Sequence, residues 1–308
     1  MIYDLAIIGG GTAGLTAALF AARHGMKTVV LERMMPGGQI VNAEHVENFP
    51  GQPQGLAGFD LGPMLQEQAL NAGAEFSMVD VEALRLKDPY LVMETDEEMV
   101  TAKAVIVAGG SSLRKLGLPK EEELHGNGVS YCASCDGPFF SGQDVAVVGG
   151  GDSALDEALT LTEFATHVTV LCRSEGLEAQ QVLKDRVLAH PKIEVRLNTE
   201  VTEIIGEAGL EGAALRDTVT GETTRLDLSG LFIFVGLDPN SGYLRDVLAL
   251  DGGGHVEVDL SMRTPVPGVF AAGDIRQQSV AQLAASAGDG ATAAISAFRY
   301  VSGRQWPS

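Results

Sequence analysis

The sequence predicts an α/β protein built around two Rossmann-type βαβ units. A strand, a glycine-rich turn, a helix and a second strand occur in this order twice, over residues 5–32 and again over residues 145–173. Each strand is a continuous run of aliphatic and β-branched residues without alternation, which is typical of parallel strands buried on both faces. A single glycine turn is weak evidence, but two of them in the same strand–turn–helix context predict two nucleotide-binding units.

Composition and charge exclude several classes of protein and of partner. The chain has 308 residues, of which 45% are hydrophobic and 20% charged, so it is globular and long enough for two domains. No apolar run is long enough to cross a membrane. The formal net charge of −20 argues against nucleic acid and anionic membranes as partners. The first residues read as a strand and not as a signal peptide, so we expect a cytoplasmic protein.

The first glycine turn contains Gly9, Gly11 and Gly14, and the strand that follows its helix ends on Glu32. Glycines in this pattern let the backbone approach a pyrophosphate, which then lies at a helix N-terminus. An acid at the end of the second strand can bind the ribose hydroxyls of an adenosine. The alternative for Glu32 is an ordinary exposed side chain at a strand end.

The second glycine turn contains Gly149, Gly151 and Ala154 and predicts a second nucleotide site by the same physics. Near the C-terminus a short strand closes on Gly273 and Asp274. We further expect helices over residues 62–72 and 155–164, strands over 104–108 and 230–235, and a helix over 281–300 that Gly288 and Gly290 interrupt.

The three cysteines are Cys132, Cys135 and Cys172. Two of them form a Cys-x-x-Cys pair, which in a cytosolic protein predicts a redox dithiol or half of a metal site. A metal site needs a second pair of ligands at matching spacing, and the sequence offers none, so we expect no metal. Cys172 lies alone at the end of an apolar strand, as a small core residue does.

Five short motifs, taken in their order along the chain, resemble those of the low-molecular-weight thioredoxin reductases, which are FAD-dependent disulfide reductases. The resemblance covers essentially the whole chain, and its most specific part is the Cys-Ala-Ser-Cys-Asp-Gly segment just before the second nucleotide unit. The motifs lie at residues 9–14, 36–40, 46–51, 132–137 and 271–274.

The resemblance implies a three-layer FAD/NAD-binding fold with one domain inserted in the other. Residues 1–112 and 240–308 would form the FAD domain, and residues 113–239 the inserted domain of the pyridine-nucleotide type with the dithiol. Outside the first glycine turn, the residues placed near FAD are Gly38, Gln39, Asn48, Gly273, Asp274 and Gln282. For Gln39 and Asn48 the alternative is turn chemistry, and for Asp274 it is a helix N-cap.

The resemblance also assigns the chemistry. Electrons would pass from a donor to FAD, then to the Cys132–Cys135 disulfide, and then to a thioredoxin-like protein. It makes Cys135 the sulfur nearer the flavin and Cys132 the one that attacks the partner, with Asp136 as general acid/base. The alternative for Asp136 is helix N-capping or stabilisation of the helix dipole. A homodimer is also implied, and Trp306 in the C-terminal tail has no assigned role.

The second nucleotide site departs from the family pattern. NADPH members carry His-Arg-Arg-x-x-x-Arg after the second strand of this unit, and those cations bind the adenosine 2′-phosphate. The matching run here keeps Arg173 alone, because Ser174 and Glu178 replace the other two arginines. Two carboxylates, those of Glu175 and Glu178, would oppose the phosphate, so the sequence disfavours NADPH.

Three donors remain open: NADH, a reduced ferredoxin, or another flavin. Ferredoxins are usually acidic and would need a basic patch on this acidic chain. The one cluster of cations, at Arg114, Lys115 and Lys120, is more simply interpreted as a solvated face. Two other functions also stay open: a dithiol oxidase acting on a small-molecule dithiol, and a redox sensor without turnover.

Overall fold

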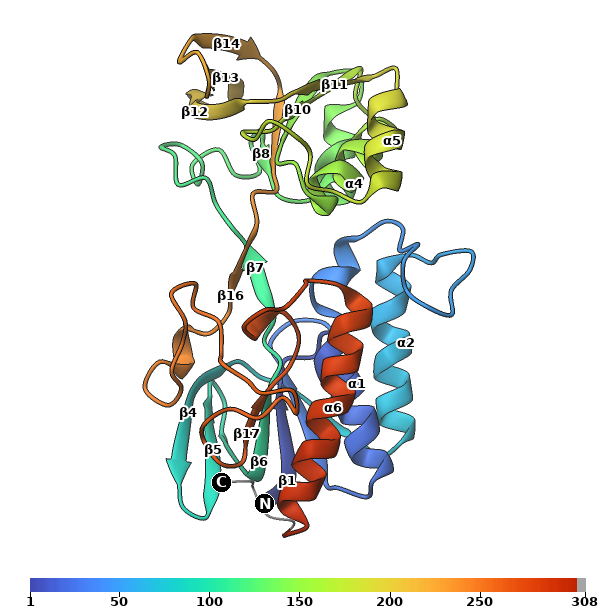
Figure 1. Ribbon diagram of the computed structural model, residues 1–308, viewed down its shortest axis with the longest axis vertical. Helices are drawn as coiled ribbons and strands as arrows, with labels where there is room; N and C mark the ends of the chain where they lie inside the picture. Colours follow the sequence, from blue (N-terminus) through green and yellow to red (C-terminus); the bar gives the residue numbers. More distant parts are fainter. Residues whose placement is uncertain (304–308) are drawn as a thin grey trace. The chain divides into compact units, whose positions relative to one another are not determined.

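The computed structural model describes residues 1–303, and Figure 1 shows their path. The chain divides into two compact units. Unit 1 comprises Met1–Ser112 and Asp238–Ser308, and unit 2 comprises Leu113–Leu237. The second unit is therefore inserted in the first, as the fold-class prediction states, and the insertion ends at residue 237 where residue 239 was expected. Trp306 lies outside the described residues.

Unit 1 is built on a seven-stranded sheet with strand order β3-β2-β1-β6-β5-β4, in which β17 also pairs with β6. The strands β1, β2, β3, β6 and β17 pair in parallel, and β4 and β5 add an antiparallel hairpin beside β6. The strands are β1 (Ile2–Ile8), β2 (Thr28–Glu32), β3 (Glu75–Met78), β4 (Val81–Lys87), β5 (Tyr90–Thr95), β6 (Met99–Val107) and β17 (Val269–Ala271).

Three α-helices of unit 1 lie side by side, with α1 packed against both α2 and α6 (Figure 1). They are α1 (Thr12–Arg23), α2 (Gly58–Asn71) and α6 (Leu283–Val301), and the 3-10 helices are η1 (Gly38–Asn42), η3 (Gly242–Leu244) and η4 (Gly273–Ile275). None of the helices within residues 1–303 is long and apolar enough to cross a bilayer.

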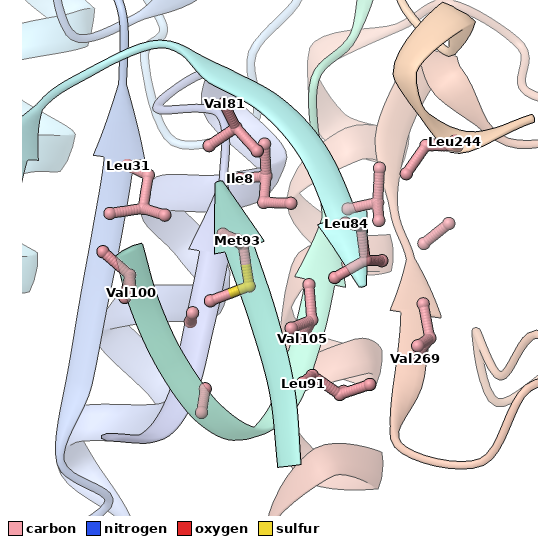
Figure 2. Close-up of a cluster of buried hydrophobic side chains, with 14 of the residues drawn as sticks. Ile8, Leu31, Val81, Leu84, Leu91, Met93, Val100, Val105, Leu244 and Val269 are labelled. Atoms are coloured by element: carbon pink, nitrogen blue, oxygen red, sulfur yellow. The ribbon is translucent and has the colours of Figure 1, made fainter. Parts of the chain in front are cut away.

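The core of unit 1 covers both faces of the parallel strands. Along β1, Leu5 and Ile7 join the cluster under α1 and α6, while Ala6 and Ile8 join the cluster on the opposite face. Figure 2 shows the cluster that contains Ile8. In it, side chains of β1, β2 and β6 contact those of the β4–β5 hairpin and of η3. Burial on both faces explains why β1 reads as a continuous apolar run.

Unit 2 contains a five-stranded parallel sheet with strand order β11-β10-β9-β15-β8 and a three-stranded antiparallel sheet with order β12-β13-β14. Its strands are β8 (Val129–Ser130), β9 (Asp144–Val148), β10 (His167–Leu171), β11 (Ile193–Arg196), β12 (Thr199–Gly206), β13 (Leu210–Asp217), β14 (Thr223–Asp227) and β15 (Gly230–Ile233). Its helices are α3 (Ala133–Asp136), η2 (Gly137–Phe140), α4 (Asp152–Leu161) and α5 (Gln181–Ala189). The connecting strands are β7 (Ser111–Leu113) and β16 (Leu237–Pro239).

The predicted interruption of the last helix is wrong. Helix α6 is continuous from Leu283 to Val301 and passes through both glycines. Gly290 faces α1 so closely that a Cβ there would collide with the carbonyl oxygen of Ala13, so this glycine allows close packing instead of breaking the helix. The helix also starts later than expected, because Ala281 has a left-handed φ of 49° and cannot continue a right-handed helix.

Candidate active site

The first glycine turn of unit 1 connects β1 to α1. A Cβ at Gly14 would collide with the carbonyl oxygen of Gly9, so glycine there is needed for the packing of the helix on the turn. A Cβ at Gly11 would contact only Gly37 and Gly38, at 3.8 and 4.0 Å. The protein itself therefore does not require a glycine at position 11, and the free space above it is where a pyrophosphate can approach the helix N-terminus.

An unpaired hydroxyl supports this interpretation. The Oγ1 atom of Thr12, at the first position of α1, is buried without a hydrogen-bond partner; the only other such side-chain atom within residues 1–303 is the Tyr243 hydroxyl. Thr12 itself is 5% exposed. Buried polar atoms are rarely left unpaired, so a missing acceptor beside the glycine turn is expected. A phosphate oxygen of a dinucleotide is such an acceptor, and the residues of the turn therefore fit FAD.

Glu32 at the end of β2 is held against this turn by two backbone amides. Gly10 N donates to its Oε2 at 2.6 Å and Met34 N donates to its Oε1 at 2.9 Å. Each carboxylate oxygen keeps a further lone pair for the hydroxyl of a ribose. The predicted acid is thus fixed beside the predicted pyrophosphate site and is not a freely moving surface side chain.

Two sets of hydrogen bonds in unit 1 join four of the residues that the resemblance places near the flavin. Gln39 Nε2 donates to the carbonyl oxygen of Ser111 at 3.3 Å, and Ser111 Oγ donates to the carbonyl oxygen of Asp274 at 3.3 Å. Asn48 Nδ2 donates to Gln282 Oε1 at 3.3 Å. Gly38 has a left-handed φ of 66° and starts η1 next to Gly11. Segments far apart in the sequence are therefore brought together here.

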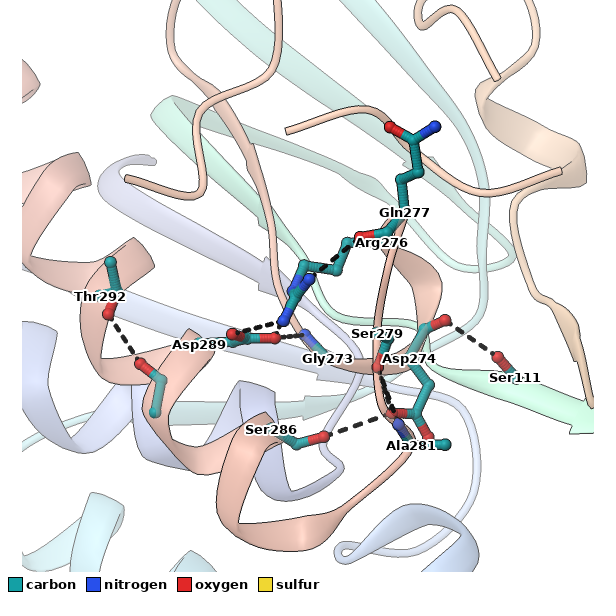
Figure 3. A network of polar contacts seen from close by, with 11 residues as sticks. Ser111, Gly273, Asp274, Arg276, Gln277, Ser279, Ala281, Ser286, Asp289 and Thr292 are labelled. Carbon is teal, nitrogen blue, oxygen red and sulfur yellow. Dashed lines mark hydrogen bonds and ion pairs between the residues drawn. The ribbon is translucent and has the colours of Figure 1, made fainter. Parts of the chain in front are cut away.

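Asp274 lies in a buried polar network at the start of α6 (Figure 3). Its Oδ1 accepts hydrogen bonds from Ser279 Oγ at 3.1 Å and from Ser286 Oγ at 3.4 Å. Burial of the carboxyl, reinforced by the charge of Asp289, raises the pKa of Asp274, although the two hydroxyls and Arg276 act in the opposite direction.

The neighbouring ion pair holds the Gly273–Asp274 turn in place. Asp289 Oδ2 accepts from Arg276 Nε at 2.5 Å and from Gly273 N at 3.2 Å, and Asp289 Oδ1 accepts from Arg276 Nη2 at 3.0 Å. Both side chains are largely buried. No local motif indicates this pair, since the two residues are 13 positions apart and only the fold joins them.

The second glycine turn connects β9 to α4 in unit 2. A Cβ at Gly151 would meet no atom within 4 Å, so this turn also leaves room for a ligand. Asp152 at the start of α4 accepts hydrogen bonds from the backbone and side-chain nitrogens of Gln180, at 2.7 and 2.8 Å. Glu178 N donates to Gly150 O at 2.8 Å, so the segment that departs from the family pattern lies against the turn.

Beside the end of β10, Arg173 and Glu178 are exposed, Ser174 is half-buried, and Ala154 is buried under the turn. Cys172 is 4% exposed and its thiol faces Gly150, which agrees with a core role. Within residues 1–303, no group of three or more His, Cys, Asp or Glu side chains is arranged to hold a metal ion.

The dithiol lies at the start of the short helix α3. Cys132 and Cys135 form a disulfide whose Cα atoms are 5.4 Å apart. Cys132 is the N-cap residue and its Sγ accepts from Cys135 N at 3.2 Å. Cys132 is half-buried and Cys135 is exposed. The amide and the first turn of a helix stabilise negative charge, which favours the thiolate form of the reduced pair.

Asp136 ends α3 and is held by Ser130, a residue the sequence analysis did not select. Ser130 Oγ lies 2.6 Å from Asp136 Oδ2 and accepts from Cys132 N at 3.1 Å. A second carboxylate, that of Glu157 on α4, accepts from Ala133 N at 2.6 Å. Two acids therefore flank the disulfide, and only the one next to the second cysteine was visible from the local motif.

Known proteins match the chain over nearly its whole length. A family model described as pyridine nucleotide-disulphide oxidoreductase matches residues 3–291. The thioredoxin reductase of Mycolicibacterium smegmatis is 44% identical over 301 residues, which cover 97% of each chain. The NADPH-dependent thioredoxin reductase 3 of Arabidopsis thaliana is 43% identical over 310 residues, covering 98% of this chain and 59% of that protein.

The fold agrees with these sequence matches. The crystal structure of Lactococcus lactis thioredoxin reductase (FR conformation) has a TM-score of 0.96 with 40% identity, and the match covers 98% of this chain and 99% of that one. The resemblance drawn from the five motifs is therefore confirmed. This chain belongs to the pyridine nucleotide-disulphide oxidoreductase family and, within it, to the low-molecular-weight thioredoxin reductases.

Proposed function

We propose that this flavoenzyme reduces the disulfide of a thioredoxin-like protein, with FAD bound by unit 1 and the reacting dithiol carried by unit 2. The observation that carries the proposal is the Cys132–Cys135 disulfide at the start of α3, next to the carboxylate of Asp136. The name thioredoxin reductase, shared by the similar proteins, supports the choice of partner. When bound, FAD supplies the chemistry that takes an electron pair from a donor and delivers it to a disulfide.

The exchange with the partner takes place in two steps. In the reduced enzyme the Cys132 thiolate attacks one sulfur of the partner disulfide, whose S–S bond breaks as a mixed disulfide forms. The departing partner thiolate takes a proton from Asp136. Asp136, now ionised, takes the proton of the Cys135 thiol. The resulting thiolate attacks Cys132 Sγ, which releases the second partner sulfur and restores the Cys132–Cys135 disulfide. Two electrons pass from the enzyme dithiol to the partner.

An exposed aromatic residue near the dithiol favours a protein partner over a small dithiol. Phe139 in η2 is 77% exposed, four positions after Cys135. Exposed aromatic rings supply much of the contact energy at protein interfaces. A small molecule that reacts with Cys132 would need no such surface.

We also propose that the electron donor lacks an adenosine 2′-phosphate. Of the three cation positions that bind this phosphate in the family pattern, only Arg173 remains, and the exposed carboxylates of Glu175 and Glu178 would oppose it. The Arabidopsis relative is named for NADPH, so the proposal is that this chain differs from it at Ser174 and Glu178.

Three donors satisfy this condition: NADH, reduced ferredoxin and a second flavin. The cation cluster that a ferredoxin would need is engaged within unit 2. Arg114 Nη2 donates to Leu237 O at 2.9 Å, Lys120 Nζ donates to Gly206 O at 2.6 Å, and Lys115 pairs with Glu122. These contacts weaken the case for ferredoxin docking there. From the resemblance we further propose a homodimer, which sedimentation equilibrium of the holoenzyme tests.

The proposed exchange is tested by trapping the mixed disulfide. The Cys135→Ser holoenzyme, with Cys132 reduced, is mixed with a bacterial thioredoxin in which serine replaces the second active-site cysteine and the first forms a mixed disulfide with 2-nitro-5-thiobenzoate, the leaving group. A covalent adduct of one enzyme chain and one thioredoxin, detected by non-reducing mass spectrometry, is expected. The matched Cys132→Ser variant should form none. An adduct with Cys132→Ser alone would reverse the two roles, and no adduct with either variant would refute the exchange.

A further inference from the structure

The Ser130 hydroxyl contacts both the dithiol segment and the proposed acid/base. It ends β8, where it pairs with Phe232 of β15, and it is 1% exposed. Its Oγ lies 2.6 Å from Asp136 Oδ2, 3.1 Å from Cys132 N and 3.3 Å from Cys132 O. A buried residue of a parallel sheet has a fixed position, so these contacts are set by the sheet and not by a mobile loop.

The hydrogen-bonding capacity of a hydroxyl decides which contacts are made. Ser130 has one proton to donate and lone pairs with which to accept. Cys132 N–H uses a lone pair. The carbonyl oxygen of Cys132 already accepts from Asp136 N at 3.2 Å, and the carboxylate lies closer to the hydroxyl. The proton of Ser130 therefore goes to Asp136, and a hydrogen bond of this kind stabilises and orients the charged carboxylate.

Titratable groups reach the surroundings of Asp136 from several elements. On α3 itself they are Cys132 and Cys135. Tyr131, between Ser130 and Cys132, donates to Glu121. From α4, the Glu157 carboxylate accepts from Ala133 N, a backbone group of α3, whereas Ser130 contacts the Asp136 carboxylate itself.

We propose that Ser130 is a positioning residue for thiol–disulfide exchange: it holds the Asp136 carboxylate and the Cys132 amide in one arrangement beside the dithiol. This inference rests on the proposed function, in which Asp136 transfers the proton. Ser130 touches neither the partner nor the flavin in this scheme and acts only through Asp136 and Cys132.

The test measures the rate at which dithionite-reduced holoenzyme reduces a bacterial thioredoxin at neutral pH. Ser130→Ala is expected to lower this rate by about tenfold, the effect of losing one hydrogen bond to a charged group. The Ser130→Thr variant keeps the hydroxyl and should recover most of the rate, which a loss of packing alone would not allow.

Two comparisons separate positioning from a general loss of structure. Ser141→Ala removes another serine hydroxyl of unit 2, one that donates to Pro138 O at 2.9 Å, and should leave the rate unchanged. When Asp136 is already asparagine, adding Ser130→Ala should lower the rate little further, since the two residues act as one unit. Equal losses with Asp136 present and replaced, or a Ser130→Thr variant as slow as Ser130→Ala, would overturn the proposal.

The failure of the proposed function gives a different result. If Asp136→Asn leaves the rate unchanged, the proton-transfer step of the proposed function is wrong. If wild-type enzyme does not reduce thioredoxin, the partner is wrong, and the same variants are compared with bis(2-hydroxyethyl) disulfide, an alkyl disulfide whose departing thiolate still needs a proton. With that probe, a Ser130→Ala rate equal to wild type overturns the role of Ser130, and a lower rate that Ser130→Thr restores supports it.

Discussion

Asp274 is a carboxylate that the fold buries at a cost. Burial, reinforced by Asp289, raises its pKa above the ordinary value of about 4. In the pH range between the ordinary and the raised pKa, the folded state binds more protons than the unfolded state. The stability of unit 1 therefore falls as pH rises through this range and stays lowered above it. A ligand that uses the charged carboxylate is the simplest reason to keep such a residue.

The Asp274→Asn substitution follows from this argument. Asparagine still accepts from Ser279 and Ser286 but carries no buried charge, so the FAD-free protein is expected to unfold at a higher temperature at pH 7. This increase in unfolding temperature should vanish below about pH 4, where Asp274 is protonated in the folded and in the unfolded protein. FAD affinity should fall by about tenfold. Thermal unfolding of the FAD-free proteins checks the first point; equal Tm values at neutral pH would contradict it.

We attribute the weak binding expected for a nucleotide with a 2′-phosphate to Ser174 and Glu178. Changing both to arginine places two guanidinium groups where the family pattern has them, and each such pair with a phosphate contributes about 1.5–3 kcal/mol. The double variant should bind NADP⁺ at least about 100-fold more tightly than wild type, by isothermal titration calorimetry.

A control substitution at a distant exposed site accompanies this variant. Glu163→Arg changes the charge of an exposed residue just before β10, at the opposite end of the strand from Arg173, and should leave NADP⁺ affinity unchanged. If wild-type protein already binds NADP⁺ as tightly as the double variant, the two substitutions have not eroded the site.

At the level of elements, the segment before the dithiol is fixed by Glu121. This carboxylate is 2% exposed and accepts from Leu116 N at 2.9 Å, Gly117 N at 2.7 Å, Leu118 N at 3.2 Å and Tyr131 Oη at 2.7 Å. Tyr131 lies between Ser130 and Cys132, so Glu121 ties the loop over residues 116–118 to the dithiol segment. Burial of Tyr131 and its hydrogen bond to Glu121 both raise the pKa of the tyrosine hydroxyl.

Removing this carboxylate should be strongly destabilising. Glu121→Ala leaves three backbone amides and a tyrosine hydroxyl without their acceptor, and we expect a loss of about 3 kcal/mol in the free energy of unfolding of unit 2. Glu122→Ala, at the exposed neighbour, should leave the free energy of unfolding nearly unchanged. Urea unfolding followed by circular dichroism measures both, and similar midpoints for the two variants would refute the role given to Glu121.

Element prediction succeeded where the signal was local. Both strand–turn–helix units lie where the glycine patterns and apolar runs placed them, because those residues define the turn by themselves. The β4–β5 hairpin and the three-stranded sheet β12–β14 were not predicted, since their alternation is weak and their partners decide their conformation. The same holds for the site: Ser130, Glu121 and Glu157 are defined by contacts and not by a motif.

At the scale of the whole molecule, ligand binding should stabilise one unit more than the other. The glycine turn, Thr12 and Glu32 all lie in unit 1, so removing FAD should lower the temperature at which unit 1 unfolds. Added FAD should restore it in a concentration-dependent way, while added riboflavin, which lacks the pyrophosphate, should not. Differential scanning calorimetry distinguishes the two transitions, and an FAD effect confined to unit 2 would contradict the assignment.

We expect this thioredoxin reductase to take its electrons from a donor without an adenosine 2′-phosphate. An anaerobic titration of the FAD-loaded protein, followed by flavin absorbance at about 450 nm, tests this directly. NADPH, NADH and reduced ferredoxin are added to separate samples, with dithionite as the control for complete reduction. NADPH should leave the absorbance unchanged, while NADH or reduced ferredoxin should bleach it. Rapid bleaching by NADPH at stoichiometric concentration would show that the 2′-phosphate is accepted after all.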